Sequence, residues 1–236
     1  MKILAVDTSA TAASVCLATE DKILGEFYTN TALTHSQTLV PMVEQVLKTT
    51  RTDMDEIDYF AVNAGPGSFT GVRIGVAAVK GMAFKNNTPC VSVSTLESMA
   101  YNMLGNDCVV CAVMDARCSQ VYNALFKISG ANIERLCEDR ALALSDLKLE
   151  LEKITDKIIL VGDGAELCAK FLENSLSNVF LAPINNRVQT AASTAMAAFK
   201  SISEDKTMSP AELMPTYLRL PQAQRELNKR LGSGQK

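Results

Sequence analysis

Hydrophobic and polar residues follow a pattern along the chain that occurs twice, once in each half. Each half begins with three short runs typical of strands, and spacings typical of amphipathic helices then alternate with two further apolar runs. In the first half, the pattern predicts strands at residues 2–6, 14–18, 23–28, 59–63 and 90–93 and helices at 35–47, 69–85 and 95–104. In the second half, it predicts strands at 108–114, 121–128, 133–137, 158–161 and 179–181. It also predicts one helix that is capped by Ser145 and two further helices at 165–173 and 190–201.

The predicted order of elements is therefore βββαβαβα in both halves, although no sequence identity is visible between them. The three leading strands of each half are expected to be antiparallel within a mixed sheet, with helices on its faces. We expect an N-terminal domain at residues 1–105, a C-terminal domain at 106–204, and a tail at 205–236 that packs back or is partly disordered. This duplicated α/β arrangement is the pattern of the actin, Hsp70 and sugar-kinase superfamily (ASKHA), whose members bind a nucleotide between the halves.

Composition and charge narrow the class of protein. The chain has 236 residues, of which 47% are hydrophobic and 21% charged, and its net charge is −3. Such a chain is globular, can bury a large core without disulfides, and is too acidic to coat nucleic acid. Only the tail reverses the sign, since the side chains of residues 217–236 sum to +4. Direct RNA binding by this tail is a third, weaker hypothesis of function.

Two features favour a cytoplasmic protein that does not associate with a membrane. The first apolar run ends at Asp7, which is too short for the core of a signal peptide, and no run approaches the roughly 20 residues of a membrane span. The seven cysteines are odd in number, and several lie in predicted strands, as reduced core thiols do. Cys108 and Cys111 form a CxxC pair, but a strand would point them to opposite faces, which favours packing over a metal or redox site.

The number of histidines excludes several kinds of metal site. His35 is the only histidine in the chain. HExxH and HxxxH metallohydrolases and iron sites with two histidines are therefore excluded, and we expect neither a bound metal nor a cofactor. His35 lies at the start of a predicted helix, where a surface or capping role is favoured over that of a general base, because no nearby cysteine or serine forms a nucleophile pair with it.

A glycine-rich segment connects a predicted strand to a predicted helix. Residues 65–75 read Gly-Pro-Gly-Ser-Phe-Thr-Gly-Val-Arg-Ile-Gly. Thr70 and Gly71 stand where a Walker A motif requires glycine and lysine, and Thr70 also breaks the dinucleotide-binding fingerprint. The segment is then a tight loop in which Ser68 caps the helix. Its free N–H groups could hold an anion, or the glycines could only redirect the chain, and the residues support both interpretations equally.

The helix at 69–85 is apolar on nearly all sides, which predicts that more than one side is buried. One face, which we call the smooth face, consists of Gly71, Gly75, Ala78 and Met82. Each of its two glycines costs about 1 kcal/mol in a helix interior. We expect a partner subunit to approach this face, with helix 35–47 as the second element of a helical bundle. The residues expected to bind the partner are Leu39, Met42, Val46, Gly71, Gly75, Ala78 and Met82. The alternative is a helix buried inside its own domain, between the sheet and a neighbouring helix.

Asp7 and Asp115 each follow the first strand of their half, where ASKHA proteins place the carboxylates that handle a metal-bound phosphate. The hairpins beside them contain no glycine, so side chains would crowd a phosphate. We therefore expect at most a vestigial nucleotide site, formed by Asp7, Thr8, Ser9 and Asp115. Aspartate at a strand end is also a common turn former. The alternative function is a small ATPase or kinase that uses Asp7 and Asp115.

Seven segments match one known family in order and spacing, namely residues 3–9 (ILAVDTS), 35–36 (HS), 65–75, 92–96 (SVSTL), 114–117 (MDAR), 161–165 (VGDGA) and 215–219 (PTYLR). In these segments the chain resembles the TsaB (YeaZ) family, and the resemblance covers nearly its whole length. The eleven-residue Gly-Pro-Gly block is the most specific of them.

The resemblance implies an accessory subunit of the bacterial system that places threonylcarbamoyl on the adenosine next to the tRNA anticodon. It implies a non-catalytic ASKHA-fold protein that forms a homodimer alone and, through helices of its N-terminal half, a heterodimer with the catalytic relative TsaD. A TsaE-like ATPase would join as a third subunit, and tRNA would be reached through the complex. TsaD holds a metal through a HxxxH motif, which this chain lacks, so a metalloprotease activity is not supported.

Overall fold

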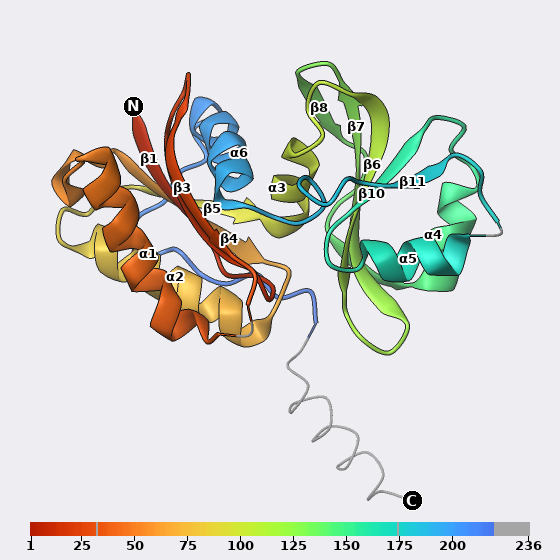
Figure 1. The fold of residues 1–236 in the computed structure, drawn as a ribbon, viewed down its shortest axis with the longest axis horizontal. Coiled ribbons are helices and arrows are strands. Elements are labelled where there is room, and N and C mark those ends of the chain that lie inside the picture. Colours follow the sequence, from red (N-terminus) through yellow and green to blue (C-terminus); the bar gives the residue numbers. More distant parts are fainter. Residues whose placement is uncertain (32, 174, 220–236) are drawn as a thin grey trace, which may run out of the picture.

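The computed structural model describes residues 1–31, 33–173 and 175–219, in which two mixed sheets lie side by side (Figure 1). The first sheet consists of β1 (Lys2–Asp7), β2 (Ala13–Thr19), β3 (Ile23–Thr29), β4 (Tyr59–Gly65) and β5 (Cys90–Ser94). The second consists of β6 (Asp107–Asp115), β7 (Gln120–Ser129), β8 (Asn132–Arg135), β9 (Arg140–Ala143), β10 (Ile158–Val161) and β11 (Val179–Leu181). The helices are α1 (His35–Thr50), η1 (Met54–Glu56, a 3-10 turn), α2 (Phe69–Phe84), α3 (Thr95–Tyr101), α4 (Leu144–Leu151), α5 (Ala165–Leu172) and α6 (Ala191–Ser203). None of these helices is both long and apolar enough to cross a membrane.

The first half has the predicted βββαβαβα order, the second half has one strand more before its first helix, and the duplicated ASKHA-type α/β fold class is confirmed. The first sheet has the order β3-β2-β1-β4-β5 and the second β11-β10-β6-β7-β8. In each sheet the first strand is antiparallel to the second and parallel to the next one along the order. The strand predicted at 133–137 corresponds to β8, and β9 is an additional short strand that was not predicted; both pair with β7. Ser68 caps α2 as predicted, whereas α4 begins after Ala143 and not at Ser145.

The last helix of each half covers the sheet of the other half. α1 and α2 pack on one face of the first sheet, and α6 covers the opposite face. In the same way, α4 and α5 cover one face of the second sheet, and α3 covers the other. Figure 1 shows α6 beside the first sheet and α3 between the two sheets. The predicted boundary at residue 105 therefore separates the two sheets but not the units that pack together.

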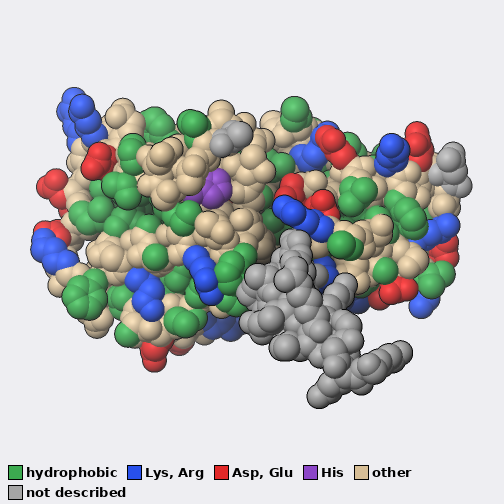
Figure 2. All heavy atoms as spheres, turned by 90° about the horizontal axis from the view of Figure 1, so that it is seen from below, with side chains coloured by type: hydrophobic (Ala, Val, Ile, Leu, Met, Phe, Trp, Pro, Cys, Tyr) green, Lys and Arg blue, Asp and Glu red, His purple; other side chains and the backbone are tan. Residues whose placement is uncertain are grey.

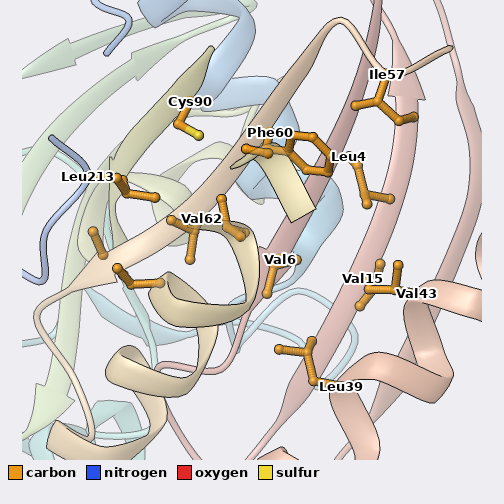
Figure 3. Close-up of a cluster of buried hydrophobic side chains, with 14 of the residues drawn as sticks. Leu4, Val6, Val15, Leu39, Val43, Ile57, Phe60, Val62, Cys90 and Leu213 are labelled. Atoms are coloured by element: carbon orange, nitrogen blue, oxygen red, sulfur yellow. The ribbon is translucent and has the colours of Figure 1, made fainter. Parts of the chain in front are cut away.

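The core between α1 and the first sheet contains residues that were expected at a partner interface. Leu39 and Val46 are 1% and 0% exposed and belong to this core, and Met42 is half-buried against it. Figure 3 shows Leu39 and Val43 directed toward the strands. The prediction that Leu39 and Val46 contact a partner is wrong, because the apolar stripe of α1 is needed to cover its own sheet.

The smooth face of α2 is internal as well. A Cβ atom on Gly71 would collide with the carbonyl oxygen of Thr8, and one on Gly75 would lie 2.5 Å from Thr8 Oγ1. That hydroxyl donates a hydrogen bond to the Gly71 carbonyl at 2.7 Å. Ala78 and Met82 are half-buried and pack against the core. The prediction that Gly71 and Gly75 admit a partner helix is therefore wrong, because they admit the turn that follows β1.

We expect opposite effects from a methyl group added at two glycines of α2. Gly81 is exposed, and nothing lies within 4 Å of its Cβ position, so Gly81→Ala should raise the free energy of unfolding by about 1 kcal/mol through helix propensity. Gly75→Ala should lower it by about 1–3 kcal/mol, because Thr8 must move. Urea unfolding measures both changes, and two changes of the same sign would contradict this assignment of the faces.

After α6, the chain returns to the first sheet as a segment that we call the strap, residues 208–219. Met208 exchanges two backbone hydrogen bonds with Cys90 of β5, at 2.8 and 2.9 Å. Leu213 is fully buried in the core beneath α2, where Figure 3 shows it near Val62. Most of the basic residues predicted in the tail lie outside the described residues.

The CxxC pair is divided between two cores, as its place in a strand predicted. Cys108 lies in the core with α3, and Cys111 lies in the core with α4 and α5, on the other face of the sheet. All seven cysteines are free. Burial holds the pKa of the Cys111 thiol well above its usual range, so this sulfur stays protonated and unreactive.

Candidate functional site

A cleft of about 680 Å³ lies between the halves, where loops follow β1, β4, β6 and β10. Open α/β sheets bind ligands at this end of their parallel strands. The charged side chains that line the cleft are Asp115, Arg117, Asp163 and Arg219. Figure 2 shows acidic and basic side chains gathered at this junction, with the histidine on the N-terminal side. Of the four residues predicted for a vestigial nucleotide site, Ser9 and Asp115 line the cleft.

The Gly-Pro-Gly loop closes against the turn after β1. The Ser68 N–H donates to the carbonyl of Ser9 at 2.6 Å, and a Cβ atom on Gly67 would collide with the same carbonyl. The second half repeats this arrangement, since a Cβ atom on Gly164 would lie 2.9 Å from the backbone of Met114. Both glycine loops thus serve the close approach of two backbones, which favours the packing interpretation over an anion site.

Asp7 lies behind the cleft, not in it. Its side chain is 1% exposed, and Thr8 is fully buried. The N–H and Oγ of Ser9 each donate to Asp7 Oδ1 at 2.7 Å, and Asn63 Nδ2 donates to Oδ2 at 2.7 Å. Burial raises the pKa of Asp7, and these hydrogen bonds oppose the rise. The Asp7 carboxylate therefore joins β1 to β4, and the structure places Asp7 and Thr8 where neither reaches a ligand in the cleft.

Asp115 and Asp163 form an acidic pair on the C-terminal wall. The Asp115 N–H donates to Asp163 Oδ1 at 3.2 Å, and Asp115 Oδ1 accepts from the Arg117 N–H at 2.7 Å. Desolvation raises the pKa of Asp163 to about 6, and the Asp115 carboxylate raises it as well. Both carboxylates line the cleft, and each of them repels a phosphate. Sequence reasoning noted the VGDGA segment but missed Asp163, although it follows β10 in the way that the Gly-Pro-Gly loop follows β4.

Stability should depend on pH through Asp163. Folding raises the pKa of the Asp163 carboxyl group from 3.8 to about 6, so ionisation of this group disfavours the folded state. The resulting loss of folding stability grows as the pH rises between these two values and is complete above the higher one. Asp163→Asn removes the ionisation. We expect the variant to match wild type near the lower of these pH values and to exceed its stability at neutral pH. Thermal unfolding across this range measures the difference, and a difference that does not change with pH would rule out the assignment.

His35 contacts the turn after β1. Its Nε2 lies 2.7 Å from the carbonyl oxygen of Ala10, and the half-buried ring lines the cleft. This is a structural contact with the backbone, and α1 begins at His35 itself without a side-chain cap from Thr34. Within residues 1–31, 33–173 and 175–219, no three His, Cys, Asp or Glu side chains come together in a way that could hold a metal ion.

Known proteins place this architecture in a family. The family model of TsaD, tRNA N6-adenosine threonylcarbamoyltransferase, matches residues 22–226. The Bacillus subtilis protein named tRNA threonylcarbamoyladenosine biosynthesis protein TsaB is 31% identical to this chain over 225 residues, which cover 95% of this chain and 96% of that protein. The chain belongs to the TsaB family.

Further relatives agree with membership of the TsaB family. The Escherichia coli protein of the same name is 30% identical over 222 residues and covers 93% of this chain and 95% of its own length. The solved structure of YeaZ from Pseudomonas aeruginosa superposes with a TM-score of 0.77 at 25% identity and covers 92% of this chain and 99% of that one. The TsaB family thus matches this chain in length as well as in fold.

In this TsaB-family chain, the exposed side of α2 forms a face distinct from the one that was predicted. We call it the outer α2 face: Thr70, Arg73, Ala77, Gly81 and Phe84. Phe84 is 81% exposed, and Val40 on the neighbouring helix α1 is 53% exposed. The sequence could have indicated this exposed face, because at 100° per residue its five positions share one sector of the helix and include a single charged residue.

Proposed function

We propose that this chain is a non-catalytic, cytoplasmic subunit for the synthesis of threonylcarbamoyladenosine in tRNA. In this proposal it binds a TsaD-type catalytic subunit through the outer α2 face and the adjoining surface of α1. The same surface forms a homodimer when the catalytic subunit is absent. A TsaE-type ATPase joins the assembly, and tRNA is reached through the complex.

The observation that carries the proposal is the outer α2 face in a member of the TsaB family. Phe84 leaves most of its ring in solvent, and Gly81 meets nothing within 4 Å. An exposed glycine in a helix interior is unfavourable in an isolated chain, and a helix that approaches closely would offset this cost. α1 lies beside α2, so two helices are available to bury the roughly 800 Å² per partner of a specific interface.

The alternative, a small ATPase or kinase, is less well supported. The Asp7 carboxylate accepts three hydrogen bonds within the chain and is almost fully buried. Asp115 and Asp163 place negative charge on the wall that a phosphate would approach. Neither hairpin supplies a glycine at which a phosphate could come close to the backbone.

Two titrations test the proposal against its alternative. Calorimetry with a purified TsaD-type subunit should show a one-to-one complex with a Kd of micromolar or below. Calorimetry with ATP and magnesium on the isolated chain should show no comparable binding. Micromolar ATP binding with turnover, together with no affinity for the TsaD-type subunit, would replace the proposed function with the enzyme.

A further inference from the structure

The strap contains the PTYLR segment at residues 215–219, to which the proposed function assigns no role. Hydrogen bonds attach the strap to the N-terminal half of the protein. Lys80 Nζ donates to the carbonyls of Ala211 and Leu213 at 3.0 Å each, and the Thr216 N–H donates to the carbonyl of Ala64 at 2.7 Å. These hydrogen bonds attach the strap to α2 and β4.

The next residues of the strap cross the cleft. Tyr217, Leu218 and Arg219 all line it. Arg219 Nη1 donates to the carbonyl of Ala116 at 2.9 Å, on the turn between β6 and β7. A segment fixed to the first sheet thus holds a loop of the second. A hydrogen bond from a charged donor is among the stronger ones, so this contact favours a closed cleft.

The same strap is also connected to the outer α2 face. Arg73 Nε donates to Tyr217 Oη at 2.7 Å. The Arg73 guanidinium lies 3.8 Å from the centre of the Phe69 ring, and the Phe69 and Tyr217 rings are 4.9 Å apart. Arg73 is exposed on the outer α2 face, whereas Phe69 and Tyr217 line the cleft. One guanidinium thus links the proposed docking surface to the strap.

We propose that the strap is a latch that couples the outer α2 face to closure of the interdomain cleft. A partner that offers a carboxylate to Arg73 withdraws its hydrogen bond from Tyr217, which loosens residues 217–219 and releases Arg219 from Ala116. The coupling rests on the proposed function, because it needs a partner on that face, but the latch itself does not. Coupling between two sites is reciprocal, so opening the latch should strengthen binding of the partner.

Hydrogen exchange on the isolated full chain tests the latch. Arg219→Ala should speed exchange of the cleft loops at residues 66–70 and 114–120 about ten-fold, the scale of one hydrogen bond from a charged donor. Arg219→Lys keeps a donor and should stay near wild type. Arg117→Ala is the matched control, since it removes the same charge from the cleft and its side chain forms no hydrogen bond among the described residues. Equal exchange in Arg219→Ala and wild type would overturn the latch.

Sedimentation with the TsaD-type subunit tests the coupling. Arg219 lies outside the outer α2 face, yet Arg219→Ala should tighten association about three- to ten-fold, while Arg117→Ala should not. Faster exchange with unchanged association would overturn the coupling. If wild type binds neither the TsaD-type subunit nor itself, the proposed function fails, and the exchange experiment still decides whether the latch exists.

Discussion

Ala77→Arg should leave the fold intact and abolish most of the association with a TsaD-type subunit and with a second copy of the chain. Ala77 is exposed on the outer α2 face, so the isolated chain has room for a long side chain there. In a helix-to-helix contact, the same side chain would place a charge in the dehydrated centre of the interface. We expect association to weaken about 100-fold, or roughly 3 kcal/mol.

Sedimentation measures this loss, and circular dichroism verifies the fold. Leu149→Arg is the matched control, because Leu149 is 58% exposed on α4, a helix of the other half. It should associate as wild type does. Gly75→Arg is an unsuitable probe, since the residue faces Thr8 inside the domain and the variant should fail to fold. A folded Ala77→Arg variant that still binds the TsaD-type subunit would exclude this face as the interface.

Asp7→Ala should be among the most destabilising single substitutions in the chain. Removal of the carboxylate leaves both donors of Ser9 without an acceptor in a buried site, and the Asn63 amide keeps only its longer hydrogen bond, to Ser98 Oγ at 3.3 Å. Buried donors without partners cost about 1–3 kcal/mol each, so we expect the free energy of unfolding to fall by about 3–5 kcal/mol. Urea unfolding at neutral pH is the measurement.

Asp115→Ala is the control for this substitution, because Asp115 occupies the same place in the second half but is exposed. It should change the free energy of unfolding by less than about 1 kcal/mol. If Asp7→Ala were as mild as Asp115→Ala, the structural role of Asp7 would be refuted. A large loss of stability combined with normal binding of the TsaD-type subunit near 4 °C would separate the role of Asp7 in folding from any role in the complex.

The duplicated fold could be predicted because its signals are local. Strands buried on both faces read as apolar runs, and helices such as α1 show their stripe every three or four residues. The exchange of α3 and α6 between the sheets leaves no such trace. Leu96 and Met99 show that one side of α3 is buried, and Ala195 and Ala198 show the same of α6, but a stripe does not say which sheet it covers.

The candidate site was predicted less well, because its residues depend on distant partners. Gly71 and Gly75 correctly indicated that a close neighbour lies against α2. The helical projection could not distinguish a partner subunit from Thr8, which is more than sixty positions earlier in the chain. For Asp7, the decisive fact is the amide of Asn63, 56 positions away. No spacing rule connects those two residues before the strands are paired.

The exchange of α3 and α6 sets the order in which the chain can mature on the ribosome. The face of the first sheet that contains Ile3, Ala5 and Cys16 is covered by α6, which is synthesised last among the helices of the structure. The first hundred residues therefore leave the exit tunnel with one apolar face of the sheet bare, and the core on that face cannot be completed before α6 is synthesised. The core between α6 and the first sheet therefore forms last, whereas every helix and strand that packs on the second sheet, α3 included, has been synthesised by Leu181.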